Sequence, residues 1–482
     1  MLLTYQFELR VNDCLGIILG HLTYAASKLF NVGNYERKEY KSLGFDKMPN
    51  WYDQKKRLKD NVWYRALPPN TAQEVLACLH NSWKSYFSLH SKWANKNKDI
   101  PEDERINEPQ PPRYKKDGCH SSVKYLPSAF RVMDGRIRFA IPPSLKLLLK
   151  EKYNIVNEFI YIKFKKTLDL IKQIEFSYID KNKYSVSIYY EKQAVSYKED
   201  NKRYISIDIG VKNLLSVYDN NGSSFIVSGS SILNNNYYFS KKIAYYRSIL
   251  DRCYQERAKG KMTERLTKLY ELRRKRTKQI LHRSTRMIVD YCSSHDISKV
   301  LIGDLSGILS KKNIDFFNNK EKHRYNQNMR AINFDTIYEY LDYKLKLVGV
   351  ELIKVDESYS SSCAPTSPAV SKEYSEKEHR IERGLFKDGN TIYNADVVGA
   401  YNIMRIYKQN NNQTLLMPLD GLSNPKKEYI PVTDQFLNED YINWNGKAGN
   451  VGISGRNYPT GYELIELINN SITKIMSHNL TN

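Results

Sequence analysis

The stretch YISIDIGV at residues 204–211 decides the fold of the second half of this chain, because it has the apolar pattern of a buried strand and carries one acid, Asp208. Two later stretches repeat the pattern, VLIGDLSGI at 300–308 and NADVVGAYNI at 394–403. A carboxylate at the end of a buried strand is costly unless something pairs with it, and a divalent cation is the usual partner of several converging carboxylates. The three stretches therefore predict a site of the two-metal kind that hydrolyses phosphodiesters.

The segments around YISIDIGV predict the layer that carries this site. The strands LLSVYD and SFIVSG follow it as an antiparallel meander. A basic helical region over roughly 237–295 comes next, followed by the strand KVLIGDL, a helix near 331–347, the strand VELIKV and a last helix from Ala395 to about Ile406. Antiparallel strands first and strand-helix alternation afterwards predict an RNase H-like α/β layer, with the first strand central, the fourth beside it and the fifth beyond.

The third acid of the predicted site is displaced. Gly303 stands where the second stretch should carry a carboxylate, and Asp304 follows it. Successive strand residues point to opposite faces, so Asp304 cannot simply replace the missing acid. Glu357 lies just past VELIKV, on the strand next to the second stretch and within reach of the same edge. We therefore predict Asp208, Glu357 and Asp396 as catalytic, metal-binding acids. Asp304 is the alternative third ligand, and a turn-capping role for Glu357 or an inactive site are the other possibilities.

The first 192 residues predict a small β-barrel interrupted by helices. Residues 3–9 alternate apolar and polar side chains, which is the period of a half-buried strand. The period becomes helical from about Asp13 to Ala94, and a polar, proline-rich linker follows. Strands return in FRVMDGRIRFAIP, a hairpin with Asp134-Gly135 at its turn, and in three further patterns that end by about residue 192.

Composition points to a polyanionic partner. Lys and Arg exceed Asp and Glu by 75 − 53 = 22, and residues 241–286 alone hold 16 basic against 4 acidic side chains. So concentrated a surplus predicts nucleic acid binding rather than general solubility. No stretch reaches about 18 consecutive apolar residues and the N-terminus lacks signal-peptide features, so we expect a cytoplasmic protein. Six cysteines without a CxxC pair predict reduced, mostly buried thiols and neither a disulfide framework nor a zinc site.

Three basic segments supply candidates for contacts with phosphates. The segment RRKRTKQILHRSTR at 273–286 has an apolar side that can face the core, while PPRYKKDG at 111–118 and YIKFKK at 161–166 interleave aromatics with lysines. Phosphate neutralisation and base stacking are the functional interpretation, and a solvated helix face or barrel core is the alternative. The predicted nucleic-acid-binding residues are Lys115, Lys116, Lys163, Lys165, Lys166, Arg273, Arg274, Lys275, Arg276, Lys278, Arg283 and Arg286.

In this order, ISIDIGVKN, the basic helical region, IGDLSGI, GVELIKVDESYSSSC and RGLFKDGNTIYNADVVGAYNI resemble the RuvC nuclease domain of transposon-encoded TnpB proteins and their descendants, the compact type V CRISPR effectors. The likeness covers about residues 203–407. The wedge β-barrel interrupted by a helical recognition lobe, which that family carries, fits residues 1–192. Some members pair a missing Glu in the second motif with an ESYTS-like segment, which DESYSS here resembles.

The resemblance implies a division into domains. They are a wedge β-barrel of the oligonucleotide-binding kind (1–12 and 105–195), a helical recognition domain (13–104), a RuvC-like nuclease domain (203–360 and 393–408), a target-nucleic-acid-binding insert (361–392) and a C-terminal extension (409–482). Many relatives bind zinc in that insert through paired cysteines, whereas here the interval holds only Cys363 and His379. We expect a degenerate ribbon without zinc, in which Cys363 is a buried thiol.

The function implied is an RNA-guided DNA endonuclease that cuts beside a short motif in its target. It would use two Mg²⁺ or Mn²⁺ ions, which suit hard oxygen ligands. Its partners would be a guide RNA and double-stranded DNA, without a membrane, and it would act as a monomer or an asymmetric homodimer near the nucleoid of a prokaryotic cytoplasm. The alternative is a nuclease-inactive, RNA-guided DNA-binding protein that acts by occupancy, and a third possibility is an unguided resolvase.

Overall fold

The computed structural model describes residues 1–96, 107–193, 195–254, 262–305, 332, 334–382 and 384–431. The described residues divide into two compact units, one over residues 1–193 and the other over residues 195–431. Each unit has hydrophobic cores of its own. Among the helices in the described ranges, none is long and apolar enough to cross a membrane.

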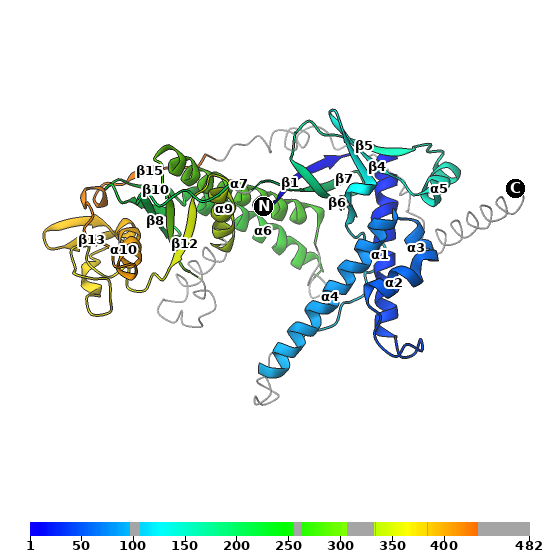
Figure 1. Ribbon diagram of the computed structural model, residues 1–482, viewed down its shortest axis with the longest axis horizontal. Helices are drawn as coiled ribbons and strands as arrows, with labels where there is room; N and C mark the ends of the chain where they lie inside the picture. The colour runs from blue at the N-terminus through cyan, green and yellow to red at the C-terminus, as the bar shows by residue number, and fades with distance from the viewer. Residues whose placement is uncertain are drawn as a thin grey trace, which may run out of the picture. The chain divides into compact units, whose positions relative to one another are not determined.

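The first unit contains two antiparallel sheets that share one core (Figure 1). The four-stranded sheet has the order β1 (Leu2–Arg10), β7 (Lys183–Glu191), β6 (Leu170–Asp180), β2 (Val123–Tyr125), and the three-stranded sheet has the order β3 (Phe130–Met133), β4 (Arg136–Ala140), β5 (Phe159–Lys163). The ring of Phe139 in β4 lies 5.0 Å from that of Tyr125 and 5.0 Å from that of Phe176. Aromatic side chains therefore join the two sheets face to face.

The predicted closed β-barrel is wrong. Within the described residues, β1 and β2 are the outer strands of the first sheet, and no strand ladder joins that sheet to the second. One reason is that β2, an outer strand of the first sheet, has only three residues. Helix α5 (Pro143–Tyr153) lies in the connection between β4 and β5, which still pair with each other. The predicted hairpin is confirmed, since β3 pairs with β4 around Gly135, whose φ of 67° lies in the left-handed region that glycine adopts readily.

Four helices occupy the segment that was predicted to be helical, and they are α1 (Asp13–Lys38), α2 (Trp51–Arg57), α3 (Val62–Arg65) and α4 (Pro69–Lys96). The buried side of α4 includes Val75, Leu79 and Trp83, which recur at the helical period. The Trp83 indole N–H donates to the Asn34 side chain of α1 at 2.9 Å, so a buried polar group of each helix is satisfied by the other.

The second unit is built on a six-stranded sheet with the order β12 (Glu351–Val355), β11 (Lys299–Gly303), β8 (Tyr204–Ile209), β9 (Asn213–Asp219), β10 (Ser224–Ser228), β15 (Lys426–Glu428). Strand β8 pairs antiparallel with β9 and parallel with β11, and β11 pairs parallel with β12. The predicted order, with the first strand central and the fourth and fifth on one side, is confirmed.

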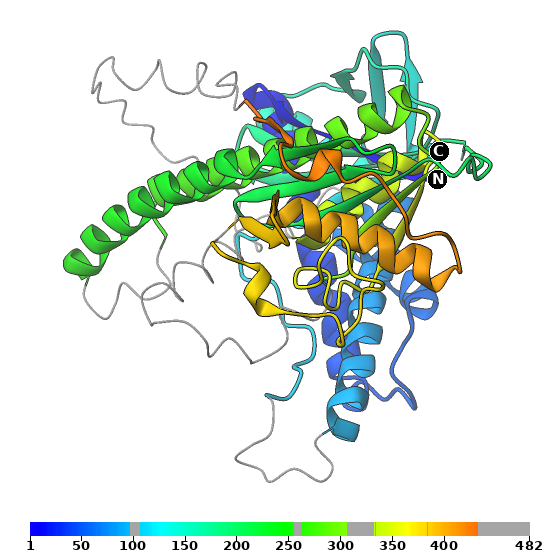
Figure 2. The same cartoon turned by 90° about the vertical axis from the view of Figure 1, so that its left-hand side faces the viewer.

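Helices cover both faces of this sheet. On one face, Ile205 and Ile207 of β8 share a core with α7 (Glu264–Ser294) and α9 (Phe334–Lys346). On the other face, α10 (Ala395–Asn410) packs against the strands, and Figure 2 shows it in orange beside them. Helix α6 (Ser230–Tyr254) packs along α7. The predicted helical segments therefore exist, with α7 and α9 separated from α10 by the sheet.

The chain after α10 returns to the second unit. Strand β15 pairs parallel with β10 and so adds a sixth strand at that edge. The Tyr218 hydroxyl donates to the Pro418 carbonyl at 2.6 Å, and the Ser231 hydroxyl donates to the Ile430 carbonyl at 2.6 Å. Residues up to 431 of the segment expected to be a C-terminal extension are therefore part of this unit.

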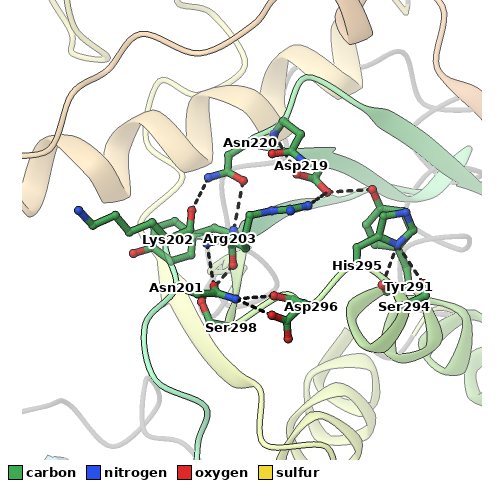
Figure 3. A network of polar contacts seen from close by, with 12 residues as sticks. Asn201, Lys202, Arg203, Asp219, Asn220, Tyr291, Ser294, His295, Asp296 and Ser298 are labelled. Carbon is green, nitrogen blue, oxygen red and sulfur yellow. Dashed lines mark hydrogen bonds and ion pairs between the residues drawn. The ribbon is translucent and has the colours of Figure 1, made fainter.

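A polar network fastens the amino-terminal ends of β8 and β11 (Figure 3). The Asn201 side chain donates to the Asp296 carbonyl at 2.7 Å and accepts from the Arg203 N–H at 2.9 Å. At the far end of β9, the Tyr291 hydroxyl of α7 donates to the buried Asp219 carboxylate at 2.9 Å. The network ties the start of the second unit to its sheet and to α7.

The expectation of mostly buried thiols is wrong. Only Cys292 and Cys363 are buried, while Cys253 is exposed and the other three cysteines are half-buried. The reason is position, because Cys292 and Cys363 lie on packed parts of the second unit, whereas Cys253 lies near the end of α6.

Candidate functional site

The predicted acids lie at the carboxyl ends of the parallel strands. Asp208 is the next-to-last residue of β8, Gly303 is the last of β11, and Glu357 follows β12 by two residues. The ladder aligns Ile302 with Ile207, so the next pair along it, Gly303 and Asp208, lies side by side. In each strand the neighbouring isoleucines face α7 and α9. Because successive residues of a strand point to opposite faces, Asp208 and position 303 face α10 instead.

Helix α10 brings Asp396 to the same edge. The Asn394 side chain caps this helix by accepting from the Asp396 and Val397 N–H groups, at 3.2 Å each. The Asn213 side chain, at the start of β9, donates to the Asp396 carboxylate at 2.7 Å. One turn further along α10, a Cβ on Gly399 would lie only 2.9 Å from the Asp208 carboxylate. The helix can therefore approach Asp208 closely only with glycine at this position.

The Glu357 side chain occupies the space of the side chain that residue 303 lacks. A Cβ built on Gly303 would lie 2.5 Å from Glu357 Oε2, a distance that real Cβ atoms essentially never show. The Glu357 carboxylate thus extends from the end of β12 to a position beside the α-carbon of Gly303, the last residue of β11. In position it replaces an acid at 303, although it comes from another strand.

Asp304 lies differently. Its backbone N–H donates to the Val355 carbonyl at 2.8 Å, which continues the ladder between β11 and β12. Its carboxylate lies 3.9 Å from the Lys354 ammonium group. As the residue after Gly303 in an extended segment, it points to the opposite face from Asp208, as expected.

The electrostatics of the edge are unfavourable to ionised acids. Burial, followed by the charges of Asp396 and Glu357, raises the pKa of Asp208 to about 8. Burial, followed by the charges of Asp304 and Asp356, raises the pKa of Glu357 to about 7. Each of these acids is therefore destabilised as a carboxylate first by burial and then by its acidic neighbours, the kind of perturbation that concentrates at functional sites.

Sequence reasoning missed three residues at this edge. Asn213 orients Asp396, Gly399 lets α10 approach, and the charge of the exposed Arg380 lowers the pKa of Asp208. Asn213 and Gly399 both stand inside the quoted motifs ISIDIGVKN and NADVVGAYNI, where their fixed spacing from the acids was the available signal. No local sequence signal marks Arg380, because it reaches the acids through tertiary structure.

The donor set suits a hard divalent cation. Three carboxylates and an amide side chain supply the oxygen atoms that Mg²⁺ and Mn²⁺ prefer, and a cation would offset both the burial and the repulsion that raise the two pKa values. Within the part of the chain that the structure describes, no three His, Cys, Asp or Glu side chains are already gathered closely enough to hold an ion. The oxygen ligands of these residues therefore suit a divalent cation, and they lie on the same face of the sheet. Their side chains are not close enough together to surround an ion.

The insert between β12 and α10 uses its Cys and His internally. The buried Cys363 thiol donates to the Ser371 carbonyl at 3.3 Å, so the prediction of a buried thiol is confirmed. The His379 ring stacks on Phe386 of β13 (Leu385–Asp388), with 5.2 Å between ring centroids, and contacts the Lys387 carbonyl at 2.9 Å. Asn402 of α10 donates to the Ser360 and Cys363 carbonyls at 2.8 Å each, which fixes the insert to that helix.

The predicted basic residues divide by exposure. Four residues of α7 are half-buried, and some are used inside the unit: Lys275 pairs with Glu271 at 3.0 Å, and the guanidinium of Arg276 lies 5.5 Å from the ring centre of Phe239. The half-buried group is Arg273, Lys275, Arg276 and Arg283. The exposed group is Lys115, Lys116, Lys163, Lys165, Lys166, Arg274, Lys278 and Arg286. The exposed group retains the geometry for contacts with phosphates, and their predicted role stays a prediction.

Two family models match the chain. Residues 187–309 match the family OrfB_IS605, described as a probable transposase, and residues 334–403 match the Cas12f1-like TNB domain. The first match contains Asp208 and Gly303, and the second contains Glu357 and Asp396. The resemblance to TnpB proteins and compact type V effectors is thus confirmed over these two segments. No curated protein matches the sequence.

Solved structures of small CRISPR effectors are similar at low identity. A Cas12f1–sgRNA–target DNA complex is 17% identical, with a TM-score of 0.32 over 84% of this chain and 100% of that one. The mini-RNA-guided endonuclease CRISPR-Cas_phi3 is 10% identical, with a TM-score of 0.40 over 84% of this chain and 92% of that one. CasPhi-2 (Cas12j) bound to crRNA is 11% identical, with a TM-score of 0.35 over 88% and 99%.

Proposed function

We propose that this protein is an RNA-guided DNA endonuclease that hydrolyses target phosphodiesters after recognition of a short adjacent motif. The observation that carries the proposal is the Glu357 carboxylate, which fills the space beside Gly303 and, after burial and Asp396, raises the pKa of Asp208. Three acids thus lie at one edge of the sheet, two of them at the ends of different strands and the third on a helix. The order and directions of β8 to β12 are those of an RNase H-like sheet, which supports a RuvC-like nuclease.

Each residue at this edge has a proposed role in the reaction. Asp208, Glu357 and Asp396 would hold two Mg²⁺ or Mn²⁺ ions, which supply activation of a water and stabilisation of the leaving oxygen. Asn213 orients the Asp396 carboxylate, as outer-shell partners of ligands do. Arg380 brings a positive charge near Asp208 from the insert, where it can contact a phosphate. The basic surplus of the chain favours a polyanionic guide and target.

We extend the proposal to the domains. Residues 203–360 and 393–408 would form the nuclease, 361–392 the target-nucleic-acid-binding insert, and 13–104 the recognition domain between wedge segments 1–12 and 105–195. The match of residues 334–403 to a TNB domain supports the place of the insert. The exposed lysines and arginines named above would contact guide or target phosphates.

The identity of the third acid is tested by two matched isosteric variants. We expect Glu357→Gln to lower the rate of Mg²⁺-dependent cleavage of a guided duplex by about 100-fold or more, since a ligand should matter at least as much as an outer-shell partner, whose loss typically costs 10–100-fold. Asp304→Asn should change the rate by less than about tenfold, because its carboxylate lies toward Lys354. The measurement is single-turnover cleavage with the RNA that co-purifies with the protein. Equal losses in both variants would contradict the assignment of Glu357.

A third variant tests the geometry directly. Gly303→Ala adds only a methyl group, yet its Cβ would lie 2.5 Å from Glu357 Oε2 and 3.1 Å from Ile403 Cδ1. We expect this variant to fold and to lose cleavage because the Glu357 carboxylate must move. Gly389→Ala, at an open turn with no neighbouring atom within 4 Å, is the control for alanine at a glycine site, although its φ of 58° adds local strain. Full activity of Gly303→Ala would show that the position of Glu357 is not required.

One observation favours the alternative of a guided protein that binds without cutting. The acids of the described chain are not gathered into a closed ligand set. The two functions differ in one measurement, because the alternative predicts tight, guide-dependent binding of the duplex that leaves the DNA uncut in either Mg²⁺ or Mn²⁺.

A further inference from the structure

Helix α6 presents one face of exposed aromatic and basic side chains, which we call the α6 face: Tyr237, Lys241, Tyr245 and Arg252. The first three follow one another at four-residue spacing, so they lie along the same side of the helix. Tyr237 and Tyr245 are 57% and 58% exposed, and Lys241 and Arg252 are exposed as well. The face therefore alternates rings and cations over about four helical turns.

The buried packing of α6 comes from the side opposite the α6 face. The opposite side of α6 carries Phe239, Ile243 and Leu250, which form a buried cluster with Leu266 of α7. These residues hold α6 on α7, while the exposed Tyr245 ring contacts the edge of the cluster through Tyr246, at 5.1 Å between ring centroids. Large side chains left exposed on a helix that is already packed indicate an interaction surface.

The positive charge of the α6 face favours a negatively charged partner. The Lys241 ammonium group lies 4.5 Å from the centre of the Tyr237 ring, which places a cation between the two tyrosines. Asp251 is the only acid of α6, and it lies next to Arg252 at the end of the face. A second copy of the chain would bring the same positive charges against it, so an isologous contact is disfavoured. A strand with negative phosphates and accessible bases complements it in charge and in ring faces.

We propose that the α6 face binds an unpaired stretch of the guide RNA, with bases stacked on Tyr237 and Tyr245 and phosphates next to Lys241 and Arg252. This inference rests on the proposed function, which supplies the guide. RNA is favoured over the DNA target because a structured RNA carries loops and bulges whose bases are free to stack from the start, whereas the DNA target exposes the faces of its bases only after it has been unwound. The α6 face would thus be a site on the second unit that contacts RNA and is separate from the acidic edge.

The test of stacking uses the full chain and a fluorescent oligouridine of about 12 nucleotides, within the site sizes of single-strand-binding folds. EDTA is present, so cleavage does not contribute. We expect Tyr237→Ala/Tyr245→Ala to weaken binding by about tenfold or more, since one stacked base commonly accounts for that factor. Tyr237→Phe/Tyr245→Phe should retain affinity, because the rings remain. Lys241→Ala should reduce the slope of log K against log salt by about 0.7, while the tyrosine changes leave that slope unaltered.

The control is Tyr429→Ala. Tyr429 is 61% exposed and has Lys427 5.9 Å from its ring centre, yet it lies outside α6. Its replacement should leave oligouridine affinity unchanged. Thermal unfolding of each variant checks that an exposed tyrosine was removed without loss of folding. Unchanged affinity in a folded Tyr237→Ala/Tyr245→Ala variant would overturn the proposal.

The source of the strand is tested by placing the photoreactive residue benzoylphenylalanine at position 245 in the protein assembled with its co-purifying RNA and a matching DNA duplex. A crosslink to RNA is expected. A crosslink to DNA alone, or to a second protein chain, would overturn the assignment. If RNA crosslinks at 245 and the complex never cuts DNA, the proposed cleavage fails while the RNA contact stands. If the complex cuts DNA and position 245 crosslinks no RNA, the contact fails while the proposed function stands.

Discussion

The two ends of the central sheet in the second unit differ in the partners of their acidic side chains. At the amino-terminal end of β8 and β11, Asp200 accepts a hydrogen bond from Lys299 at 2.7 Å and from the Tyr204 hydroxyl at 2.8 Å. Although burial acts to raise it, these bonds hold the pKa of Asp200 below its usual value. Asp219, which is only 2% exposed, accepts from the Tyr291 hydroxyl at 2.9 Å. Acids at this end are matched by donors.

At the carboxyl-terminal end of the same strands, acids face other acids. Asp208 lies four residues after Tyr204, yet its pKa is raised to about 8 by burial, Asp396 and Glu357. Glu357 fills the gap beside Gly303 rather than pairing with a lysine. One positive charge, that of Arg380, partly offsets this arrangement.

We interpret the amino-terminal end as the one that stabilises the fold and the carboxyl-terminal end as the candidate functional site. Matched donors and acceptors in a network such as that of Figure 3 favour one native arrangement. Converging carboxylates with raised pKa values oppose folding, and they persist where a bound cation or substrate gives them a use.

The largest expected effect comes from Asp208→Asn at the carboxyl end. Loss of a ligand at the centre of the site should reduce cleavage by more than about 10³-fold, which exceeds the 10–100-fold typical for an outer-shell partner. The same change removes one member of a repelling group, so the thermal midpoint of the metal-free protein should rise. Single-turnover cleavage and a thermal scan in EDTA measure the two effects. A variant that is both less active and less stable would mean that Asp208 has a paired, structural role.

The paired end should behave in the opposite manner. Asp219→Ala leaves the Tyr291 hydroxyl and the Asn221 N–H without their acceptor. We expect it to lower the free energy of unfolding by about 1–3 kcal/mol, the usual cost of a buried group left unsatisfied. Cleavage well below the melting temperature should stay unchanged. Tyr291→Phe, alone and combined with Asp219→Ala, completes a double-mutant cycle by urea unfolding, and additive losses would show that the pair is not coupled.

The same contrast explains how far the sequence predicted the structure. Strand order, the edge that carries Asp208 and Asp396, and the opposite direction of Asp304 all follow from apolar periodicity and alternation, which are local properties. The reach of Glu357 into the space beside Gly303 was predicted only as proximity, because the side-chain path depends on the exact end of β12. Arg380 was missed because a loop residue acquires its neighbours only through tertiary packing.

Two failures elsewhere have a similar cause. The closed barrel was wrong because strand patterns specify which face is apolar but not whether the last strand pairs with the first. The three-residue β15 gave no pattern at all, since KKE is polar and its pairing with β10 comes from backbone hydrogen bonds and from contacts such as that of Tyr218 with Pro418. Short edge strands of this kind depend on the partner rather than on their own side chains.

The smallest effect is a pH dependence of stability that should belong to the acidic end alone. An acid whose pKa is raised in the folded protein binds more protons folded than unfolded between its unfolded value of about 4 and its folded value, so stability falls as pH rises through that window and levels off above it. For Asp208 the window extends to about pH 8, and for Glu357 to about pH 7. In EDTA, the thermal midpoint of the parent protein relative to Asp208→Asn should therefore decrease by a few degrees from pH 5 to pH 8. Added Mg²⁺ competes with these protons, so the increase in midpoint that it causes should be larger at pH 8 than at pH 6. Asp200→Asn should leave the difference between pH 5 and pH 8 unaltered, because its hydrogen bonds hold the pKa of Asp200 below its usual value. A parent protein whose midpoint rises over Asp208→Asn with pH in EDTA would show that Asp208 is paired like the acids at the other end of the sheet.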